Sequence, residues 1–291
     1  MNLVVGATGM LGGAICRLLA AQGRRVRALT RASSDPEKVG ALESLGAEIV
    51  RGDLKDRGSL DAACRGATTV ISTASSTVSR QQGDSIESVD RQGQLDLIEA
   101  AERAGVERFI LISFPSIDVD FPLQTAKRAA EERLRRARMT HTILQPTFFT
   151  EVWLSPALGF DPAHATARIY GGGLKKISWI SFQDVAKFAV AADESPHAIN
   201  SIVRLGGPDA LSPLEIVRLA EQVSARKFVV DHVPEDSLRA QYDAATDPLQ
   251  RSFAGLMLYY ARGHAIDMTE TLLRFPVQPL KSVREHLSAI A

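Results

Sequence analysis

The segment Gly6-Ala7-Thr8-Gly9-Met10-Leu11-Gly12 constrains the fold more than any other part of the chain. It follows a short apolar run at residues 3–5 and precedes apolar residues at helical spacing that continue to Gly23. Glycine suits a sharp turn, a close approach of backbone to a pyrophosphate, and tight packing of a helix on a strand. The order strand, loop, helix therefore favours a dinucleotide-phosphate site, although a purely structural glycine turn would share the pattern.

The first 150 residues alternate apolar strand patterns with amphipathic helix patterns. Continuous apolar strands separated by helices are typical of a parallel sheet that is covered on both faces, and its crossovers are right-handed. We therefore expect an α/β chain with a doubly wound Rossmann parallel sheet. The predicted strands cover residues 3–5, 26–29, 48–50, 69–73, 109–112 and 142–144, and the predicted helices cover residues 11–22, 36–45, 59–64, 86–104 and 124–138.

After Pro146 this regular alternation ends. Residues 177–180 and 201–205 have strand character, and the segments after Leu211 are mostly amphipathic helix with prolines as breakers. We predict an NAD(P)-binding domain over residues 1–150, to which residues 177–207 return. A smaller, mostly helical lobe over residues 151–176 and 208–291 is expected to cover the carboxyl edge of the sheet and to contact a substrate or a partner.

Composition excludes several classes of function. The chain has 34 Lys and Arg against 34 Asp and Glu, so its net charge is zero and nucleic acid is not held by bulk charge. No apolar run approaches the ~18 residues of a membrane span, and the opening Met1-Asn2-Leu3 lacks the features of a secretory signal, so we expect a cytoplasmic protein. The 2 cysteines and 6 scattered histidines do not have the spacing of a metal site, and no G-x-S-x-G elbow is present.

The end of the second predicted strand indicates which dinucleotide is bound. An NAD site typically has a carboxylate there, whereas an NADP site favours an arginine near the 2′-phosphate. Arg31 and Ser33 stand at this point, with no carboxylate before Asp35, which favours NADP(H) over NAD(H); a solvated loop arginine is the alternative. Asp53 either accepts a hydrogen bond from the adenine amino group or forms a plain turn. The residues predicted to hold the cofactor are Gly6, Thr8, Gly9, Met10, Leu11, Gly12, Arg31, Ser33, Asp53, Leu54, Thr73, Ala74 and Ser75.

Four features together carry a family resemblance. They are the glycine segment, Arg31, the triplet Gly52-Asp53-Leu54, and the run from Glu99-Ala100-Ala101 to Ile112-Ser113. In these features the chain resembles the atypical short-chain dehydrogenase/reductases, and among them the NmrA-like family, which includes isoflavone-reductase-like enzymes and NADPH:quinone reductases. The resemblance covers about residues 1–150 well and continues more loosely through residues 181–186 and 206–208.

The resemblance also implies catalytic residues. The superfamily's usual proton donor is a Tyr four residues before a Lys, but Leu123 stands four residues before Lys127, and no Tyr lies between Phe114 and Phe149. Isoflavone-reductase-like members also lack that tyrosine and use a lysine on the equivalent helix. By resemblance, Lys127 binds the nicotinamide ribose and polarises or protonates an acceptor, and Ser113 lies beside the substrate carbonyl; the alternative for Lys127 is a surface lysine.

Two functions are compatible with these features. The first is an NADPH-dependent reductase of a quinone or another conjugated carbonyl acceptor, for which a missing tyrosine matters little because the reduced ring stabilises its own charge. The second is a non-catalytic NADP(H)-binding redox sensor that signals through a partner protein. An aromatic acceptor would fit a flat apolar pocket, although core packing explains each aromatic side chain equally well. The residues predicted to line that pocket are Phe114, Phe148, Phe149 and Trp153.

Overall fold

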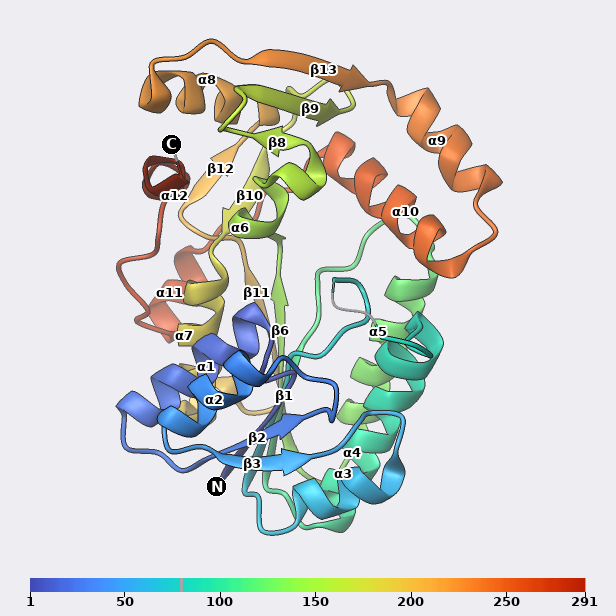
Figure 1. Cartoon of the computed structure of the whole chain (residues 1–291), viewed down its shortest axis with the longest axis vertical. Helices are drawn as coiled ribbons and strands as arrows, with labels where there is room; N and C mark the ends of the chain where they lie inside the picture. The colour runs from blue at the N-terminus through green and yellow to red at the C-terminus, as the bar shows by residue number, and fades with distance from the viewer. Residues whose placement is uncertain (79–80, 291) are drawn as a thin grey trace. The chain divides into compact units, whose positions relative to one another are not determined.

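The computed structural model of the chain describes residues 1–78 and 81–290 (Figure 1). The chain divides into two compact units. The first, which we call the sheet unit, consists of Met1–Phe114, Thr125–Gln145 and Val185–Val203. The second, which we call the C-terminal unit, consists of Pro115–Gln124, Pro146–Asp184 and Arg204–Ala291.

A seven-stranded sheet forms the centre of the sheet unit. Its strands are β1 (Asn2–Val5), β2 (Val26–Thr30), β3 (Glu48–Arg51), β4 (Thr69–Ser72), β5 (Arg108–Ile112), β6 (Thr140–Pro146) and β11 (Ser201–Leu205). The order is β11-β6-β5-β4-β1-β2-β3, and all neighbouring pairs from β6 to β3 are parallel. Two mononucleotide-binding halves produce this order in Rossmann folds, so the predicted doubly wound sheet is confirmed.

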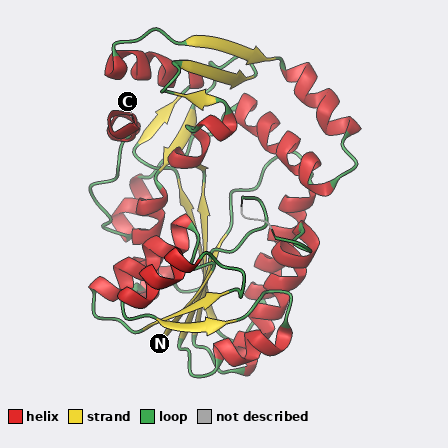
Figure 2. Ribbon diagram, in the orientation of Figure 1, coloured by secondary structure: helices red, strands yellow, loops and turns green. Residues whose placement is uncertain are grey.

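Helices cover both faces of this sheet (Figure 2). They are α1 (Met10–Ala21), α2 (Pro36–Ser44), α3 (Arg57–Cys64), the π-helix η1 (Ile86–Gly93), α4 (Gln94–Arg103), α5 (Pro122–Arg135), α7 (Phe182–Glu194) and the short 3₁₀ helix η3 (Pro196–Ala198). Figure 1 shows α1, α2 and α7 on one face and α3, α4 and α5 on the other. A buried apolar cluster that includes Leu3, Leu60, Leu97 and Phe109 joins the central strands to this second set of helices.

Local sequence explains where the first helices begin and end. The helix α1 stops just before Gly23, whose φ of +71° is the left-handed conformation that glycine adopts at helix ends. The Asp35 side chain accepts a hydrogen bond from the backbone N–H of Glu37 and caps α2, which has proline at its first position. The Asp56 side chain caps α3 in the same way.

The C-terminal unit contains two small sheets and most of the remaining helices. One sheet has the order β12-β10-β7 and is formed by residues Asp209–Leu211 (β12), Ile177–Ile180 (β10) and Phe148–Phe149 (β7). The other has the order β13-β9-β8 and is formed by residues Val229–Val233 (β13), Thr166–Tyr170 (β9) and Phe160–Asp161 (β8). The helices are α6 (Thr150–Trp153), the 3₁₀ helix η2 (Pro156–Leu158), α8 (Pro213–Ser224), α9 (Glu235–Ala244), α10 (Pro248–Arg262), α11 (Thr269–Arg274) and α12 (Val283–Ile290).

The position of β10 corrects one sequence-based expectation. Residues 177–207 were expected to return to the main sheet, but only β11 does so. The strand β10 pairs in parallel with β7, where Trp179 lies opposite Phe148, and antiparallel with β12. All four residues of β10 are buried. The mostly apolar sequence of β10 indicates a buried strand, but it carries no information about which strand lies beside it.

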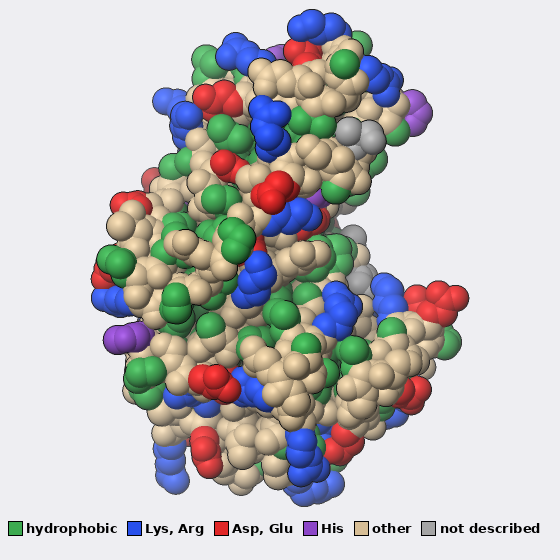
Figure 3. All heavy atoms as spheres, turned by 90° about the vertical axis from the view of Figure 1, so that its left-hand side faces the viewer, with side chains coloured by type: hydrophobic (Ala, Val, Ile, Leu, Met, Phe, Trp, Pro, Cys, Tyr) green, Lys and Arg blue, Asp and Glu red, His purple; other side chains and the backbone are tan. Residues whose placement is uncertain are grey.

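Charges of both signs are mixed on the surface. On the face that Figure 3 presents, Lys and Arg side chains are interspersed with Asp and Glu, in line with a net charge of zero. Among the helices of residues 1–78 and 81–290, none is long and apolar enough to cross a membrane.

Candidate functional site

The glycine loop joins β1 to α1 through close backbone contacts. Gly6 has a φ of +85°, and a Cβ placed on it would lie 2.6 Å from Oγ1 of Thr73. The backbone N–H of Gly9 donates to the carbonyl of Gly6 at 3.0 Å, which closes the turn. A Cβ on Gly12 would lie 2.2 Å from the Gly6 oxygen, so only glycine allows α1 to approach this closely. The three glycines thus have the turn-forming and packing roles that a dinucleotide loop requires.

The first turn of α1 is open to an anion. Gly9 is the N-cap residue and supplies no side-chain hydrogen bond, and the first turn contains no acidic residue. The backbone N–H groups at the start of a helix carry a positive partial charge and have no partner within the helix. Met10 is half exposed, and Thr8 and Leu11 are partly buried, so these predicted cofactor residues surround a helix start that remains accessible. A pyrophosphate fits this arrangement.

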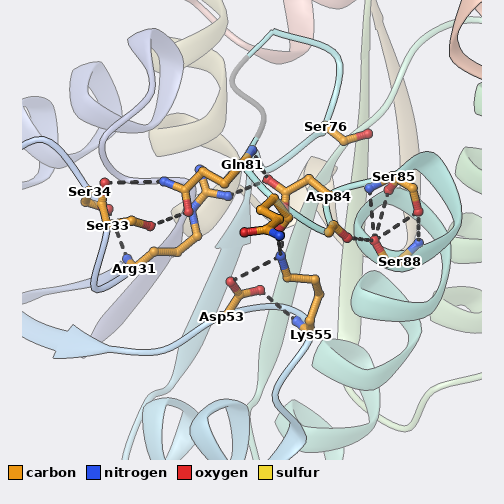
Figure 4. A network of polar contacts seen from close by, with 12 residues as sticks. Arg31, Ser33, Ser34, Asp53, Lys55, Ser76, Gln81, Asp84, Ser85 and Ser88 are labelled. Atoms are coloured by element: carbon orange, nitrogen blue, oxygen red, sulfur yellow. Dashed lines mark hydrogen bonds and ion pairs between the residues drawn. The ribbon is translucent and has the colours of Figure 1, made fainter.

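Arg31 lies in a network of polar contacts beyond β2 and β3 (Figure 4). Its Nη1 donates to Oδ2 of Asp84 at 2.7 Å, and the Lys55 ammonium donates to the other oxygen of the same carboxylate. The Ser33 hydroxyl contacts the side chain of Gln81, whose backbone N–H also donates to Asp84. The sequence indicated Arg31 and Ser33 but gave no sign of their partners, Asp84 and Gln81, because each pairing joins residues about 50 positions apart along the chain.

Two predicted cofactor residues after β3 differ in their surroundings. The Asp53 side chain is about one-third exposed and accepts from the backbone N–H of Lys55 at 2.9 Å. Asp53 therefore stabilises a turn while its carboxylate stays partly accessible to a ligand. The Leu54 side chain is buried in the apolar cluster of the sheet unit. A contact of Leu54 with a cofactor therefore has to come from its backbone, since its side chain packs in the core.

Lys127 is a buried residue of α5, not a surface lysine. Its exposed fraction is 6%, and its Nζ lies 3.4 Å from Oδ1 of Asp90, whose side chain is fully buried. The other oxygen of Asp90 accepts from the backbone N–H of Ser76 at 3.0 Å and from its hydroxyl at 2.6 Å. Asp90 belongs to the π-helix η1, and such turns are frequent at functional sites. The sequence did not single out Asp90, because one acid within an amphipathic helix has no distinctive spacing.

The loop after β4 is held by short contacts within the sheet unit. The Thr73 hydroxyl donates to the carbonyl of Val5 at 3.1 Å, and the Ser75 hydroxyl lies 3.2 Å from that of Thr77. The side-chain amide of Gln94, on α4, donates to the carbonyl of Ala74 at 3.2 Å. Thr73, Ala74 and Ser75 therefore follow β4 at the carboxyl edge of the sheet, as does the glycine loop after β1.

Ser113 is buried beside Arg128, a residue of α5 to which the sequence assigned no role at the site. It follows β5, and its hydroxyl accepts from Nη2 of Arg128 at 3.0 Å. The guanidinium carbon of Arg128 also lies 5.4 Å from the centre of the Phe114 ring. These contacts fix the orientation of Ser113 and Phe114, and Phe114 remains partly exposed.

The aromatic residues of the C-terminal unit form a packed cluster. The Phe148 ring stacks on Tyr259 at 5.1 Å and meets Trp153 edge-on at 4.7 Å, and its exposed fraction is only 2%. Phe148 is therefore a core residue, which corrects the expectation that its side chain lines an open pocket. Phe149 and Trp153 are partly exposed, so a pocket role for them stays a prediction.

The cysteines do not have the properties of nucleophiles. Both Cys16 and Cys64 are buried, and burial raises the pKa of each thiol to about 12. At neutral pH almost no thiolate forms at either position. In the described part of the chain, no group of three or more His, Cys, Asp or Glu residues is placed to hold a metal ion.

Comparisons with known proteins relate the whole arrangement to one family. Residues 2–270 match the model of the NmrA-like family. The isoflavone reductase homolog IRL of Zea mays is 30% identical over 299 residues, which cover 97% of this chain and 90% of that protein. The photosystem II assembly factor Ycf39 of Synechocystis sp. is 31% identical over 247 residues, covering 81% and 72% respectively. In fold, the chain is similar to the NADPH-dependent quinone oxidoreductase QOR2 of Escherichia coli in complex with NADPH, with a TM-score of 0.80, 21% identity, and coverage of 100% and 99%.

Proposed function

The chain belongs to the NmrA-like family, and from this premise we propose that it is an NADPH-dependent reductase of a quinone or another conjugated carbonyl acceptor. This is the family that the sequence motifs led us to expect. The observation that carries the proposal is the buried ion pair of Lys127 and Asp90. It lies in the same unit as the glycine loop, where the N-terminus of α1 has no side-chain cap. Burying an ammonium at the carboxyl edge of a Rossmann sheet costs desolvation free energy. A hydrogen bond from this ammonium to a bound cofactor or acceptor explains why a lysine is placed there.

The residues of the sheet unit fit NADP(H). The first turn of α1 offers its N–H groups to the pyrophosphate, and Gly9 at the N-cap position adds no side chain there. Arg31 supplies a guanidinium for the 2′-phosphate, and the accessible carboxylate of Asp53 is suited to the adenine amino group. The NADPH complex of the Escherichia coli quinone oxidoreductase of the same fold supports this choice of cofactor.

The chemistry divides between the cofactor and the chain. Bound NADPH supplies the hydride. Lys127 donates hydrogen bonds to the nicotinamide ribose and to the oxygen of the acceptor, where negative charge develops. Asp90 keeps the ammonium in place, and Ser76 in turn orients Asp90. Because the ring of a quinone stabilises its reduced anion, a lysine and solvent suffice as proton sources where tyrosine is missing.

The remaining predicted residues have roles around the acceptor. Phe114, next to Ser113 in the sheet unit, is partly exposed, which suits contact with a flat aromatic molecule. Ser113 is a candidate for the acceptor's carbonyl, with Arg128 holding its hydroxyl. Similarity to a relative named as an isoflavone reductase homolog supports an aromatic acceptor.

A second function has one specific observation in its favour. Ycf39, which matches 81% of this chain, is named as an assembly factor and not as a reductase. The alternative is therefore a non-catalytic NADP(H)-binding protein that acts through a partner protein. Such a protein needs different partner affinities in its different cofactor states, since equal affinities shift no equilibrium.

Oxidation of NADPH under oxygen-free conditions separates the two functions. We expect acceptor-dependent oxidation that saturates with a simple para-quinone and proceeds more slowly with an α,β-unsaturated ketone. A saturated ketone should not react, because its reduction needs a stronger proton donor than the site offers. The control is the same mixture without protein. NADPH that binds but is not oxidised above the control rate by any of these acceptors would favour the partner-dependent function and contradict the reductase.

A further inference from the structure

The carboxylate of Asp84 occupies the space between two cations (Figure 4). Its Oδ2 accepts from Nη1 of Arg31 at 2.7 Å, and its Oδ1 accepts from the ammonium of Lys55. The backbone N–H of Gln81 also donates to Oδ2, at 2.9 Å. Arg31 follows β2 and Lys55 follows β3, so the two cations come from neighbouring strand ends and converge on one anion.

Burial differs between the anion and its partners. The side chain of Asp84 is 1% exposed, whereas those of Arg31 and Lys55 are 27% and 28% exposed. Burial by itself would raise the pKa of Asp84, but the hydrogen bonds from Lys55, the Gln81 backbone and Arg31 outweigh it and lower that pKa below its usual value. The carboxylate is therefore ionised at neutral pH. Both cations are partly exposed, and the Lys55 ammonium also lies 3.7 Å from Oδ2 of Asp53.

The position of this network at the ends of β2 and β3 indicates which ligand it binds. In doubly wound folds the end of the second strand contacts the adenosine ribose, where NADP carries its 2′-phosphate. A phosphate monoester and a carboxylate both accept from a guanidinium and an ammonium through several oxygens. We propose that Lys55 joins Arg31 in binding the 2′-phosphate of NADP(H), and that Asp84 is the internal anion which this phosphate displaces. This inference rests on the proposed cofactor.

The exchange has a consequence for specificity. NADH, which lacks the 2′-phosphate, leaves the contacts of Asp84 intact and gains nothing from the two cations. NADPH gains both cations but must first break the contacts of Asp84 with them, which lowers its apparent affinity. The ratio of the NADH and NADPH dissociation constants thus depends on three side chains, Arg31, Lys55 and Asp84.

Removing the internal anion tests the exchange directly. In Asp84→Asn the side chain still accepts from the Gln81 backbone but no longer carries a charge. We expect the dissociation constant for NADPH to fall by roughly fivefold, while that for NADH stays within about twofold. Adenosine 2′,5′-bisphosphate, which carries a 2′-phosphate, should show the same fall in dissociation constant as NADPH. Adenosine 5′-monophosphate, which lacks it, should show as little change as NADH. The matched control is Asp61→Asn, which removes a carboxylate from the exposed pair of Asp61 with Arg103 in the same unit and should change neither constant.

Removing the second cation provides an independent test. In Lys55→Met, NADPH affinity should fall by roughly tenfold with little change for NADH, because a phosphate contact with one ammonium is lost. Lys227→Met is the matched control, since Lys227 pairs with Glu221 on the exposed surface of the C-terminal unit. This second variant decides the question if thermal unfolding shows that Asp84→Asn does not fold.

The possible outcomes separate the inference from the proposed function. In one outcome, the unaltered chain binds NADPH while neither Asp84→Asn nor Lys55→Met changes the ratio of the NADH and NADPH dissociation constants. That result would overturn the inference and leave the proposed cofactor in place. Weaker NADPH binding by folded Asp84→Asn would also overturn it, because the carboxylate would then assist the cofactor. If the unaltered chain binds neither dinucleotide, both the inference and the proposed function are wrong.

Discussion

Replacing Lys127 with methionine is expected to lower quinone-dependent NADPH oxidation by at least about 100-fold, the usual effect of removing a positioned proton donor. Methionine keeps most of the length and apolar volume of the lysine stem, so the loss reports the ammonium itself. The measurement is the oxygen-free rate assay at saturating NADPH. Lys227→Met, which removes an exposed lysine, should keep full activity.

The same substitution should also destabilise the fold. It leaves the fully buried carboxylate of Asp90 without its cation, and breaking one side of a buried ion pair costs about 3–5 kcal/mol. The double variant Lys127→Met/Asp90→Asn removes both charges, while the amide oxygen still accepts from Ser76. We expect denaturant unfolding to show most of the lost stability restored in the double variant, with turnover still absent. A stable double variant with normal turnover would remove Lys127 from the mechanism.

Gly12→Ala should disrupt both stability and cofactor binding. The new Cβ would lie 2.2 Å from the oxygen and 2.7 Å from the carbon of Gly6, and neither backbone atom can move without shifting the loop. Forced overpacking of this kind costs about 3 kcal/mol. Because the displaced loop holds the pyrophosphate, we also expect dinucleotide affinity to fall by roughly tenfold or more.

Gly40→Ala is the matched control for Gly12→Ala. Gly40 lies within α2, and a Cβ there would meet no atom within 4 Å. Alanine at this position should stabilise the chain by about 0.5–1 kcal/mol, because glycine is a poor helix former. Thermal unfolding and NADPH titration of both variants check the pair of predictions. Equal stability of the two variants would mean that close packing of α1 on the loop is unimportant.

The elements that could be predicted from sequence are those fixed by local chemistry. The glycine loop was recognised because its turn and packing require glycines within seven consecutive residues. Strands such as β1 and β5 were recognised because they contain short, continuous apolar runs, at residues 3–5 and 109–112. The neighbours of β10 could not be predicted in this way. Its apolar residues indicate burial, but its pairing with β7 depends on contacts between segments about 30 residues apart.

The residues of the candidate site also differ in whether the sequence could indicate them. Arg31 was indicated by its position after the second strand, where a Rossmann sheet contacts the adenosine ribose, and Lys127 by the family resemblance. Their carboxylate partners, Asp84 and Asp90, stayed unrecognised because each ion pair joins side chains that only the fold brings together. Phe148 was misjudged for the opposite reason, since an aromatic residue after a strand has the same pattern whether it lines a pocket or packs in the core.

Fluorescence titration of the chain and of Arg31→Ala with NADPH and NADH tests the central claim most directly, namely that the sheet unit binds NADP(H) through its 2′-phosphate. We expect the unaltered chain to bind NADPH at least about tenfold more tightly than NADH. In Arg31→Ala this preference should disappear because NADPH affinity falls while NADH affinity holds. Equal affinity of the unaltered chain for the two dinucleotides, or an unchanged NADPH affinity in Arg31→Ala, would contradict the account.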